Sequence, residues 1–415
     1  MLIARFRYAV AVWTLLAAVS VALGQPAPTP PSLPGAGGKS APISGKVARL
    51  GDISVLDLWG GPEQAGYAHG YLLAVQIAAL FDDYILDPRN IPEPAFYEGF
   101  LLQIRRNFAW PDAVLAELTA MERGARDRLG EKFRSKRLNR ELTLDDLLLA
   151  NAMADLHQIG CSSFTVWGPL TADGQPITGR NLDFPYTTLM MKSQIVMVYH
   201  GATPDSGWVG VTWPGLIGVY TAMNSRGVTI ALHDAPGLPL TDAIGSTPRS
   251  ITLRMALEKA ESTTFVTDIQ SVLSSNRVRV GNNIHASAPF ERGRPCAAVY
   301  EYDGNPRDKG VQLRLPKDDE LLGAALCCTN HMRLRESPTA CRRYDRVGTF
   351  ISTLKDKSQK LDIETAFQLL KDVRQSHTLH SVVFEPAAGR MHVLIPALQA
   401  TPETIKLSQW LTPRP

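Results

Sequence analysis

The chain has 415 residues, 45% of them hydrophobic and 20% charged, a composition that excludes a disordered chain and predicts a sizeable buried core. Its formal net charge of +3 is too small to indicate nucleic acid as a partner. The five cysteines show no spacing typical of a metal site, and we expect neither a metal nor a cofactor.

The first 24 residues have the three-part layout of a secretory signal. Arg5 and Arg7 precede an apolar run at residues 8–23, and small residues then fit a cleavage site before Gln25. An uncleaved membrane anchor is the alternative, but the apolar run is short for a span. We therefore expect an exported protein, periplasmic or secreted, with no stable membrane span.

Residues 25–50 are rich in Pro and Gly and are expected to be a disordered linker. Residues 51–160 are expected to be mainly helical, as an α chain or a propeptide. A strand is predicted at 52–58 and helices at 63–86, at 111–130 and from Thr143 onward. Thr143 and Asp146 suit an N-cap and the acidic residue three positions later.

The pattern changes at Cys161, after which short strands predominate. They are predicted at 162–167, 176–184, 193–200, 208–212, 217–223, 227–233, 297–302, 311–315, 322–329, 380–385 and 391–396. Helices are predicted at 250–261, 264–275, 344–355 and 363–374. Short hairpin turns imply mainly antiparallel pairing, and helices before, between and after the strands indicate two sheets covered by helices. The sequence therefore predicts an α+β layered sandwich.

Cys161 follows Gly160 and precedes two serines, and three interpretations are open. The first is a buried structural cysteine, because free cysteines are among the most buried residues. The second is the nucleophile of a thiol peptidase that has a histidine as base. In the third, the Gly160–Cys161 bond is cut, and the new α-amine (pKa about 8) takes the proton of the Cys161 thiol (pKa about 8.5). Glycine suits such a cut because a residue without Cβ tolerates a strained peptide bond.

Several segments carry a resemblance to a known family. They are Cys161-Ser162-Ser163, GRNLDF at 179–184, WGGPEQAGYAHG at 59–70, YTAMNSRGVTIALHDAPG at 220–237, TNHM at 329–332, CRRYDRV at 341–347 and HSVVFEPAAGRMHV at 380–393. In this order the chain resembles cysteine N-terminal-nucleophile hydrolases, in particular the acyl-coenzyme A:6-aminopenicillanate acyltransferase family. Choloylglycine hydrolases and penicillin V acylases are wider relatives. The resemblance implies a four-layer αββα sandwich of two mainly antiparallel sheets and a catalytic Cys161.

The resemblance also assigns roles to Arg180 and Asp183. The Asp would bind the new α-amine, and the Arg would lie beside the thiol, where a cation favours thiolate. The two residues are three apart, so ideal strand alternation places them on opposite faces. A bulge or the strand end has to intervene if both face the thiol. An ordinary salt bridge within a hairpin is the alternative.

An oxyanion formed during attack on an amide needs N–H donors. Asn330, after an apolar strand, is our side-chain candidate, although Asn in this position is commonly a turn residue. The family's second donor is a main-chain N–H, which falls at Asp234, or at His233 if the alignment shifts by one residue. Asn224 has either a site role or a place in the NSRG turn.

Arg343 matches a family arginine near the thiol and the amine, whereas Arg342 and Arg346 are its neighbours. A solvated helix start is the alternative for all three. His331 is a candidate general base, but self-supplied base catalysis does not need it. Phe184, Tyr186, Trp208 and Trp213 are candidates for an acyl pocket or for core packing.

We expect residues 161–415 to be the catalytic β chain of an α/β heterodimer made from one precursor. Cys161 attacks the amide of a small N-acylated molecule and forms an acyl-thioester, which water or an amine then accepts. Export favours hydrolysis over acyl transfer. A Cys–His thiol peptidase and a catalytically inactive binding protein of the same fold are the alternatives. The acyl and amine specificity, and any pairing among Cys296, Cys327, Cys328 and Cys341, stay open.

Overall fold

The computed structural model describes residues 43–414 except 92, 94–95, 156–159, 185, 202–205, 238–243, 306–309, 319–323, 336–339 and 413. The expected signal segment and residues 25–42 of the expected linker lie outside the described residues. The linker expectation is wrong for residues 45–50, which form strand β1 (Gly45–Leu50) and pair with β2 (Ile53–Leu58) along its length. β1 is the edge strand of its sheet, where largely exposed polar side chains are tolerated.

The larger sheet has nine strands in the order β1-β2-β7-β8-β9-β10-β11-β12-β13. Neighbouring strands are antiparallel except β2 and β7, which pair in parallel. The strands after β2 are β7 (Ile195–Tyr199), β8 (Trp208–Thr212), β9 (Thr221–Asn224), β10 (Thr229–Asp234), β11 (Asn282–Ser287), β12 (Ala297–Tyr302) and β13 (Val311–Arg314). β7 to β12 are buried along their whole length, so both faces of this part of the sheet are covered.

The smaller sheet has six strands, all antiparallel, in the order β14-β5-β6-β15-β16-β17. They are β5 (Gly160–Val166), β6 (Ile177–Asp183), β14 (Ala325–Cys328), β15 (Thr378–Glu385), β16 (Arg390–Leu394) and β17 (Glu403–Lys406). β5 and β6 are the hairpin that the sequence predicts after Cys161. A further two-stranded sheet joins β3 (Arg134–Ser135) to β4 (Arg140–Glu141).

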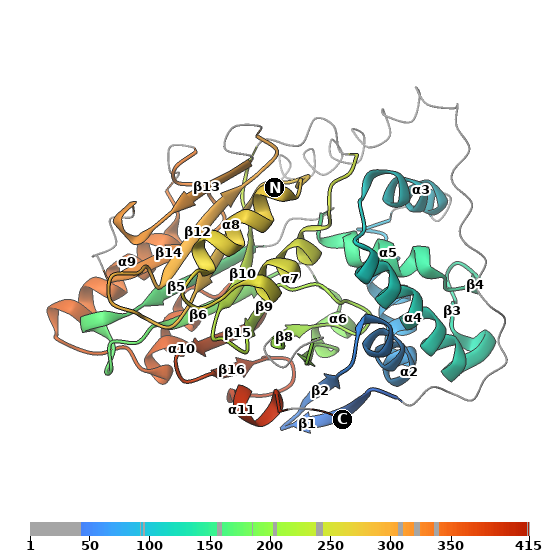
Figure 1. Cartoon of the computed structure of the whole chain (residues 1–415), viewed down its shortest axis with the longest axis horizontal. Coiled ribbons are helices and arrows are strands. Elements are labelled where there is room, and N and C mark those ends of the chain that lie inside the picture. The colour runs from blue at the N-terminus through green and yellow to red at the C-terminus, as the bar shows by residue number, and fades with distance from the viewer. Residues whose placement is uncertain are drawn as a thin grey trace. The chain divides into compact units, whose positions relative to one another are not determined.

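Helices cover the outer face of each large sheet (Figure 1). The nine-stranded sheet packs against α2 (Pro62–Leu80), α7 (Arg249–Lys259) and α8 (Phe265–Ser275), and α3 (Tyr97–Asn107), α4 (Asp112–Leu129) and α5 (Leu144–Ala152) add to that side. The six-stranded sheet packs against α9 (Arg342–Asp356) and α10 (Ile363–Asp372). The short helices are α6 (Thr188–Lys192), α11 (Leu407–Trp410), the π-helix η2 (Phe81–Ile85), and the 3-10 helices η4 (Gly130–Lys132), η5 (Met153–Asp155), η6 (Gly168–Leu170) and η8 (Pro316–Asp318).

The inner faces of the two sheets pack on each other through aliphatic side chains. Val55, Val196 and Val211 of the larger sheet share one buried cluster with Val382 and Phe384 of the smaller sheet. A second cluster joins β12 to β14 and to Trp167, which follows β5. The order of layers is therefore helix, sheet, sheet, helix, and the expected four-layer αββα sandwich of the α+β class is confirmed.

Helices α2 and α4 approach closely because glycines line their contact. A Cβ built on Gly70 would lie 1.9 Å from the carbonyl oxygen of Met121, and one on Gly66 would lie 2.0 Å from that of Glu117. These glycines belong to the segment WGGPEQAGYAHG, so part of that motif serves backbone packing. The capping box predicted for Thr143 and Asp146 at the start of α5 is confirmed.

Candidate active site

Cys161 is the second residue of β5 and lies where the neighbouring strand β14 has ended. The β14 ladder pairs Leu326 with Thr165 and Cys328 with Ser163. Continuing this register by two residues places Asn330 opposite Cys161. There the side chain of Asn330 takes over from the main chain, and its Oδ1 accepts the N–H of Cys161 at 2.7 Å. The end of β14 thus explains why an asparagine is found at this position.

Asn330 joins groups from three elements. Its Oδ1 also accepts a hydrogen bond from Nη2 of Arg343 at 2.7 Å, and its Nδ2 donates to the main-chain oxygen of Asp234 at 2.8 Å. Asp234 is the last residue of β10, in the other sheet. The main-chain N–H of Leu232 donates toward β9, to Tyr220 O at 3.0 Å. Strand alternation turns the N–H of Asp234 to the same side, beyond the last β9–β10 pair.

The thiol of Cys161 shares a strand face with Arg180. Across the β5–β6 hairpin Cys161 pairs with Leu182 and Ser163 pairs with Arg180, so these four side chains point to the same side. Arg180 is fully buried and donates to Leu232 O at 2.6 Å, Thr221 Oγ1 at 3.2 Å and Asn181 O at 3.2 Å. Burial raises the pKa of the Cys161 thiol to about 11, although the positive charge of Arg180 opposes this.

Asp183 points to the opposite face of β6, as ideal alternation predicts. It pairs with Gly160 in the ladder, accepts a hydrogen bond from Thr378 Oγ1, and lies 3.3 Å from Nη1 of Arg343. An irregularity of register lies on the neighbouring strand, between Thr378 and His380. Asp183 is therefore beside the peptide group of the Gly160–Cys161 bond, whereas Arg180 is on the side of the thiol.

Arg343 is in the first turn of α9, and its guanidinium contacts the main chain of Cys161. Nη1 donates to Cys161 O and to Asp183, and Nη2 donates to Asn330. Arg342 and Arg346 are exposed, and Arg346 pairs with Asp372 at 2.9 Å. Of the three arginines that the sequence leaves undecided, Arg343 is the one that the fold brings to Cys161.

The carboxyl group of Asp234 pairs with Arg249, a residue that the sequence analysis missed. Arg249 is fully buried, and it also binds Asn282 Oδ1 at 2.6 Å and, through its main-chain N–H, Asp155 at 3.1 Å. Burial raises the pKa of the Asp234 carboxyl to about 7 and that of Asp155 to about 6, against the charge of Arg249. An arginine in the first turn of a helix opposes the helix dipole, and this was the available sequence signal.

The two histidines and Asn224, which are the remaining polar candidates, bind groups other than Cys161. His331 binds Thr329 Oγ1 through Nδ1 at 2.8 Å, and His233 binds Ser163 Oγ through Nε2 at 2.8 Å. In the part of the chain that the structure describes, no histidine makes a hydrogen bond to Cys161. Asn224 forms its turn by accepting the N–H of Val228 at 2.9 Å, with its Nδ2 bound to two carbonyls of the α7 end.

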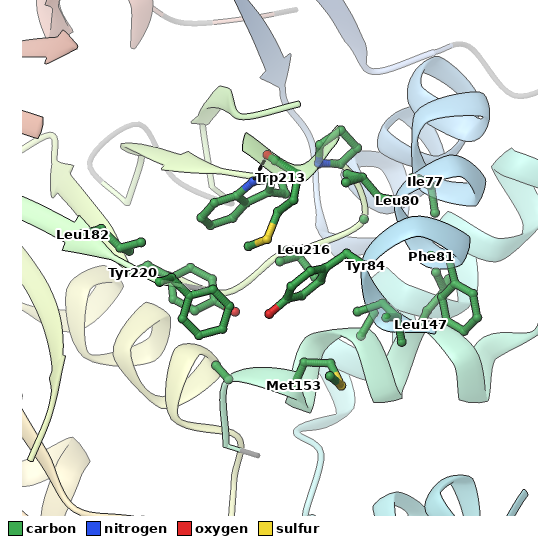
Figure 2. A pocket seen from close by; sticks show the side chains of 17 residues that line it. Ile77, Leu80, Phe81, Tyr84, Leu147, Met153, Leu182, Trp213, Leu216 and Tyr220 are labelled. Atoms are coloured by element: carbon green, nitrogen blue, oxygen red, sulfur yellow. Dashed lines mark hydrogen bonds between the residues drawn. The ribbon is translucent and has the colours of Figure 1, made fainter. Parts of the chain in front are cut away.

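An apolar cavity of about 60 Å³ lies next to this hairpin (Figure 2). Leu182, the cross-strand partner of Cys161, lines it. Figure 2 shows Trp213 and Tyr220 on the side of Leu182, with Tyr84 reaching in from the helices. The other lining residues are Ile77, Leu80, Phe81, Ile85, Leu147, Ala150, Met153, Ala154, Phe184, Met190, Pro214, Gly215 and Leu216.

Two of the four expected pocket residues, Phe184 and Trp213, line this cavity. Trp208 does not: its indole stacks on Tyr199 and donates to Glu258 on α7 at 3.1 Å, which is a core role. Tyr186 is half-buried at the edge of the core and is not among the lining residues.

All five cysteines lie in the described part of the chain, and no disulfide joins any two of them there. Within the described residues no group of three His, Cys, Asp or Glu side chains is arranged to hold a metal ion. No described helix has the length and apolar character that a membrane span needs.

Comparison with known proteins assigns the family. The family model described as "Acyl-coenzyme A:6-aminopenicillanic acid acyl-transferase" matches residues 170–398, more than half of the chain. The chain belongs to this family. The resemblance inferred from the sequence motifs is thereby confirmed. The matched region contains Arg180, Asp183, Asp234, Asn330 and Arg343, and it begins after Cys161.

Curated relatives and solved structures show weaker similarity. An uncharacterized protein of Archaeoglobus fulgidus is 24% identical over 247 residues, and protein dcd1B of Dictyostelium discoideum is 24% identical over 196 residues. These matches cover 52% and 44% of this chain, and the chain spans 39% of the length of each relative.

Several solved structures are similar over more than half of this chain. The N-acylethanolamine-hydrolyzing acid amidase ortholog of Caenorhabditis elegans is 20% identical, with a TM-score of 0.40, over 55% of this chain and 93% of that protein. The penicillin V acylase of Agrobacterium tumefaciens is 12% identical, with a TM-score of 0.42, over 60% and 87%.

Proposed function

We propose that the protein hydrolyses the amide bond of small N-acylated molecules, or transfers their acyl group, and that Cys161 acts as an N-terminal nucleophile. The observation that carries this proposal is the environment of the Cys161 nitrogen. Asn330 accepts its N–H at 2.7 Å, and Arg343 ties Asn330, Asp183 and the Cys161 carbonyl together. A structural cysteine needs no such set of polar groups around its main-chain nitrogen. An N-terminal nucleophile needs them, because that nitrogen becomes its base.

Maturation is proposed to begin with attack of the Cys161 thiol on the carbonyl carbon of Gly160. The peptide C–N bond breaks, its nitrogen takes a proton, and a thioester joins Gly160 to Cys161. Water then cleaves the thioester and leaves a carboxylate on Gly160 and a free amine and thiol on Cys161. A Cβ on residue 160 would lie 3.2 Å from the Cβ of Asp183, so a larger side chain would crowd the bond.

In turnover the freed α-amine takes the thiol proton, and the thiolate attacks the substrate amide. Nδ2 of Asn330 and the main-chain N–H of Asp234 are the proposed donors to the oxyanion. The α-ammonium then protonates the leaving amine, and an acyl-thioester remains on Cys161. Water releases the acid, or a second amine takes the acyl group. Arg180 favours thiolate by its charge, and Asp183 holds the amine in place.

The cavity supports an apolar acyl group as the part of the substrate that is recognised. Its lining is almost entirely aliphatic and aromatic, and it adjoins Cys161 through Leu182. The proposed location in the periplasm or outside the cell favours water as the acyl acceptor. A Cys–His peptidase is less well supported, because no histidine hydrogen bond to Cys161 is present in the described chain.

Incubation of the purified protein with a panel of N-acyl amides, followed by denaturing mass analysis, tests this function. We expect release of the free acid and a transient mass increase of the Cys161 chain by one acyl group, which hydroxylamine removes. Cys161→Ala should show neither. Turnover by Cys161→Ala at the wild-type rate would refute the proposal.

A further inference from the structure

Asn330 lies in a segment without regular structure, between β14 and α9, yet it has to hold two groups of the site. Its side chain is the link between the Cys161 nitrogen and the carbonyl of Asp234. A displacement of about 1 Å at such a group is able to cost about 100-fold in rate. The segment therefore needs its own support, and the hydrogen bonds of the larger sheet supply it.

Asn283, on β11, binds the main-chain carbonyl groups of both residues that flank Asn330. Its Nδ2 donates to the carbonyl oxygen of Thr329 at 3.1 Å and to that of His331 at 2.8 Å. Because both partners are carbonyl oxygens, the orientation of this amide group is defined. Asn283 is fully buried, and its Oδ1 has no hydrogen-bond partner among the described residues. Burial of an amide oxygen without a hydrogen-bond partner costs free energy. The two hydrogen bonds of the Asn283 Nδ2 therefore have to offset this cost.

Glu301 supports the same segment further along. It is the β12 partner of Asn283 in the ladder and is fully buried. Its carboxylate accepts the main-chain N–H groups of three consecutive residues, at 2.6 Å from Arg333, 3.0 Å from Leu334 and 3.1 Å from Arg335. Residues 333–335 are thereby held by β12, the neighbour of the strand that holds Thr329 and His331.

Arg314, on the next strand β13, completes the row. Its Nη2 donates to Cys327 O on β14 at 2.9 Å, and its Nε lies 3.6 Å from Glu301. Three neighbouring strands thus each contribute one buried polar side chain to residues 327–335. Replacement of buried ionic groups by well-packed apolar side chains is often neutral or stabilising, so core stability alone does not account for this row.

We propose that Asn283, with Glu301 beside it, is a positioning residue that fixes Asn330 against Cys161. Its effect on turnover rests on the proposed function. Its effect on the Asn330 segment does not, and can be measured without a substrate.

Asn283→Asp and Asn283→Leu remove both donors at similar side-chain size, one with and one without a new ionisable group. Asn224→Asp is the matched control, because Asn224 is equally buried and its Nδ2 also donates to two main-chain carbonyls, at 2.8 Å and 2.9 Å. Asn224 lies in the β9–β10 turn, at the other end of β10 from Asp234.

Two measurements are compared in protein shown to be folded and cleaved: hydrogen–deuterium exchange of residues 329–335, and steady-state kinetics on an N-acyl amide. In both Asn283 variants we expect faster exchange than in Asn224→Asp, and a kcat lowered about 10- to 100-fold with KM within about twofold. Exchange or kcat equal to that of Asn224→Asp would overturn the positioning role. If wild type turns over no N-acyl amide, the proposed function fails, and the exchange comparison alone decides whether Asn283 holds the segment.

Discussion

Arg343 shows how one side chain organises the candidate site at the scale of a residue. It is in the first turn of α9, so its long side chain reaches back past the helix start to the beginning of β5. Its two Nη groups bind Cys161 O, Asp183 and Asn330, which otherwise come from three separate segments. Lysine has the same charge but lacks the fork that reaches several acceptors at once.

Replacement of Arg343 should therefore lower chain cleavage and turnover far more than replacement of its neighbour Arg342. We expect Arg343→Ala to lower both the rate of chain cleavage and kcat about 10- to 100-fold, the size of one interaction of about 1.5–3 kcal/mol with a charged group. Arg342→Ala removes the same charge from the exposed surface of α9 and should leave both rates within about twofold. Equal effects of the two substitutions in kinetic assays would remove Arg343 from the site.

At the scale of the element, helix α5 forms part of the wall of the proposed substrate pocket. One side of α5 lines the cavity with Leu147 and Ala150, and η5, which follows it, adds Met153 and Ala154. The opposite wall comes from β6 and the segment 213–220. The proposed substrate pocket is therefore made by residues on both sides of the Gly160–Cys161 bond.

A larger side chain at Ala150 should shorten the acyl group that is accepted. Ala150→Leu adds three carbon atoms to the wall of the cavity. We expect kcat/KM for the longest acyl chains to fall about tenfold or more, while short acyl chains keep their wild-type values, since each buried CH₂ contributes about 0.8 kcal/mol. Assays over a series of acyl lengths provide the internal control. A uniform decrease at every length would contradict the assignment of the cavity.

Helix α2 carries a histidine that gives the fold a pH dependence. His69 is fully buried, its Nε2 accepts the N–H of Gly215 at 2.9 Å, and burial lowers its pKa to about 3. The unfolded chain binds a proton at this residue below its ordinary pKa of about 6.5, whereas the folded chain does not. The contribution of neutral His69 to the free energy of unfolding is thus fully present above pH about 6.5, and it is lost as the pH falls toward 3.

His69→Gln keeps an acceptor for Gly215 and removes this titration. Relative to wild type, the free energy of unfolding of the variant should improve by about 3 kcal/mol as the pH falls from 7.5 to 4.5. Urea unfolding at the two pH values measures the difference. A constant difference between variant and wild type would show that His69 is able to charge in the folded protein.

At the scale of the whole molecule, the segment before Cys161 is part of the fold. β2 pairs in parallel with β7 inside the nine-stranded sheet, and α2, α4 and α5 belong to its main core cluster. Removal of this segment would expose that core and open the sheet at β7. We therefore propose that it stays in place as a subunit after cleavage and does not leave as a propeptide.

We therefore expect both products of cleavage to stay together. Native size-exclusion chromatography of the cleaved protein should give one species that contains both polypeptides, and they should separate only in denaturant. A folded, active 161–415 chain that elutes without its partner would contradict this view of the sheet.

The parts of this structure that the sequence predicted are those with a local signal. The hairpin after Cys161, the alternation that separates Arg180 from Asp183, and the cap at Thr143 follow from period and turn chemistry. β11 was missed because NNIHAS is polar, and it is polar because it carries Asn282 and Asn283. The β2–β7 pairing and the row of Asn283, Glu301 and Arg314 depend on contacts between distant segments, for which one sequence has no local signal.

The central claim is that Cys161 becomes the first residue of the catalytic chain. Denaturing intact-mass analysis of active, purified wild-type protein tests it most directly. We predict two polypeptides, the second running from Cys161 to Pro415, and a single uncut polypeptide for Cys161→Ala. A wild-type protein that is fully active on N-acyl amides while its Gly160–Cys161 bond is intact would contradict the account.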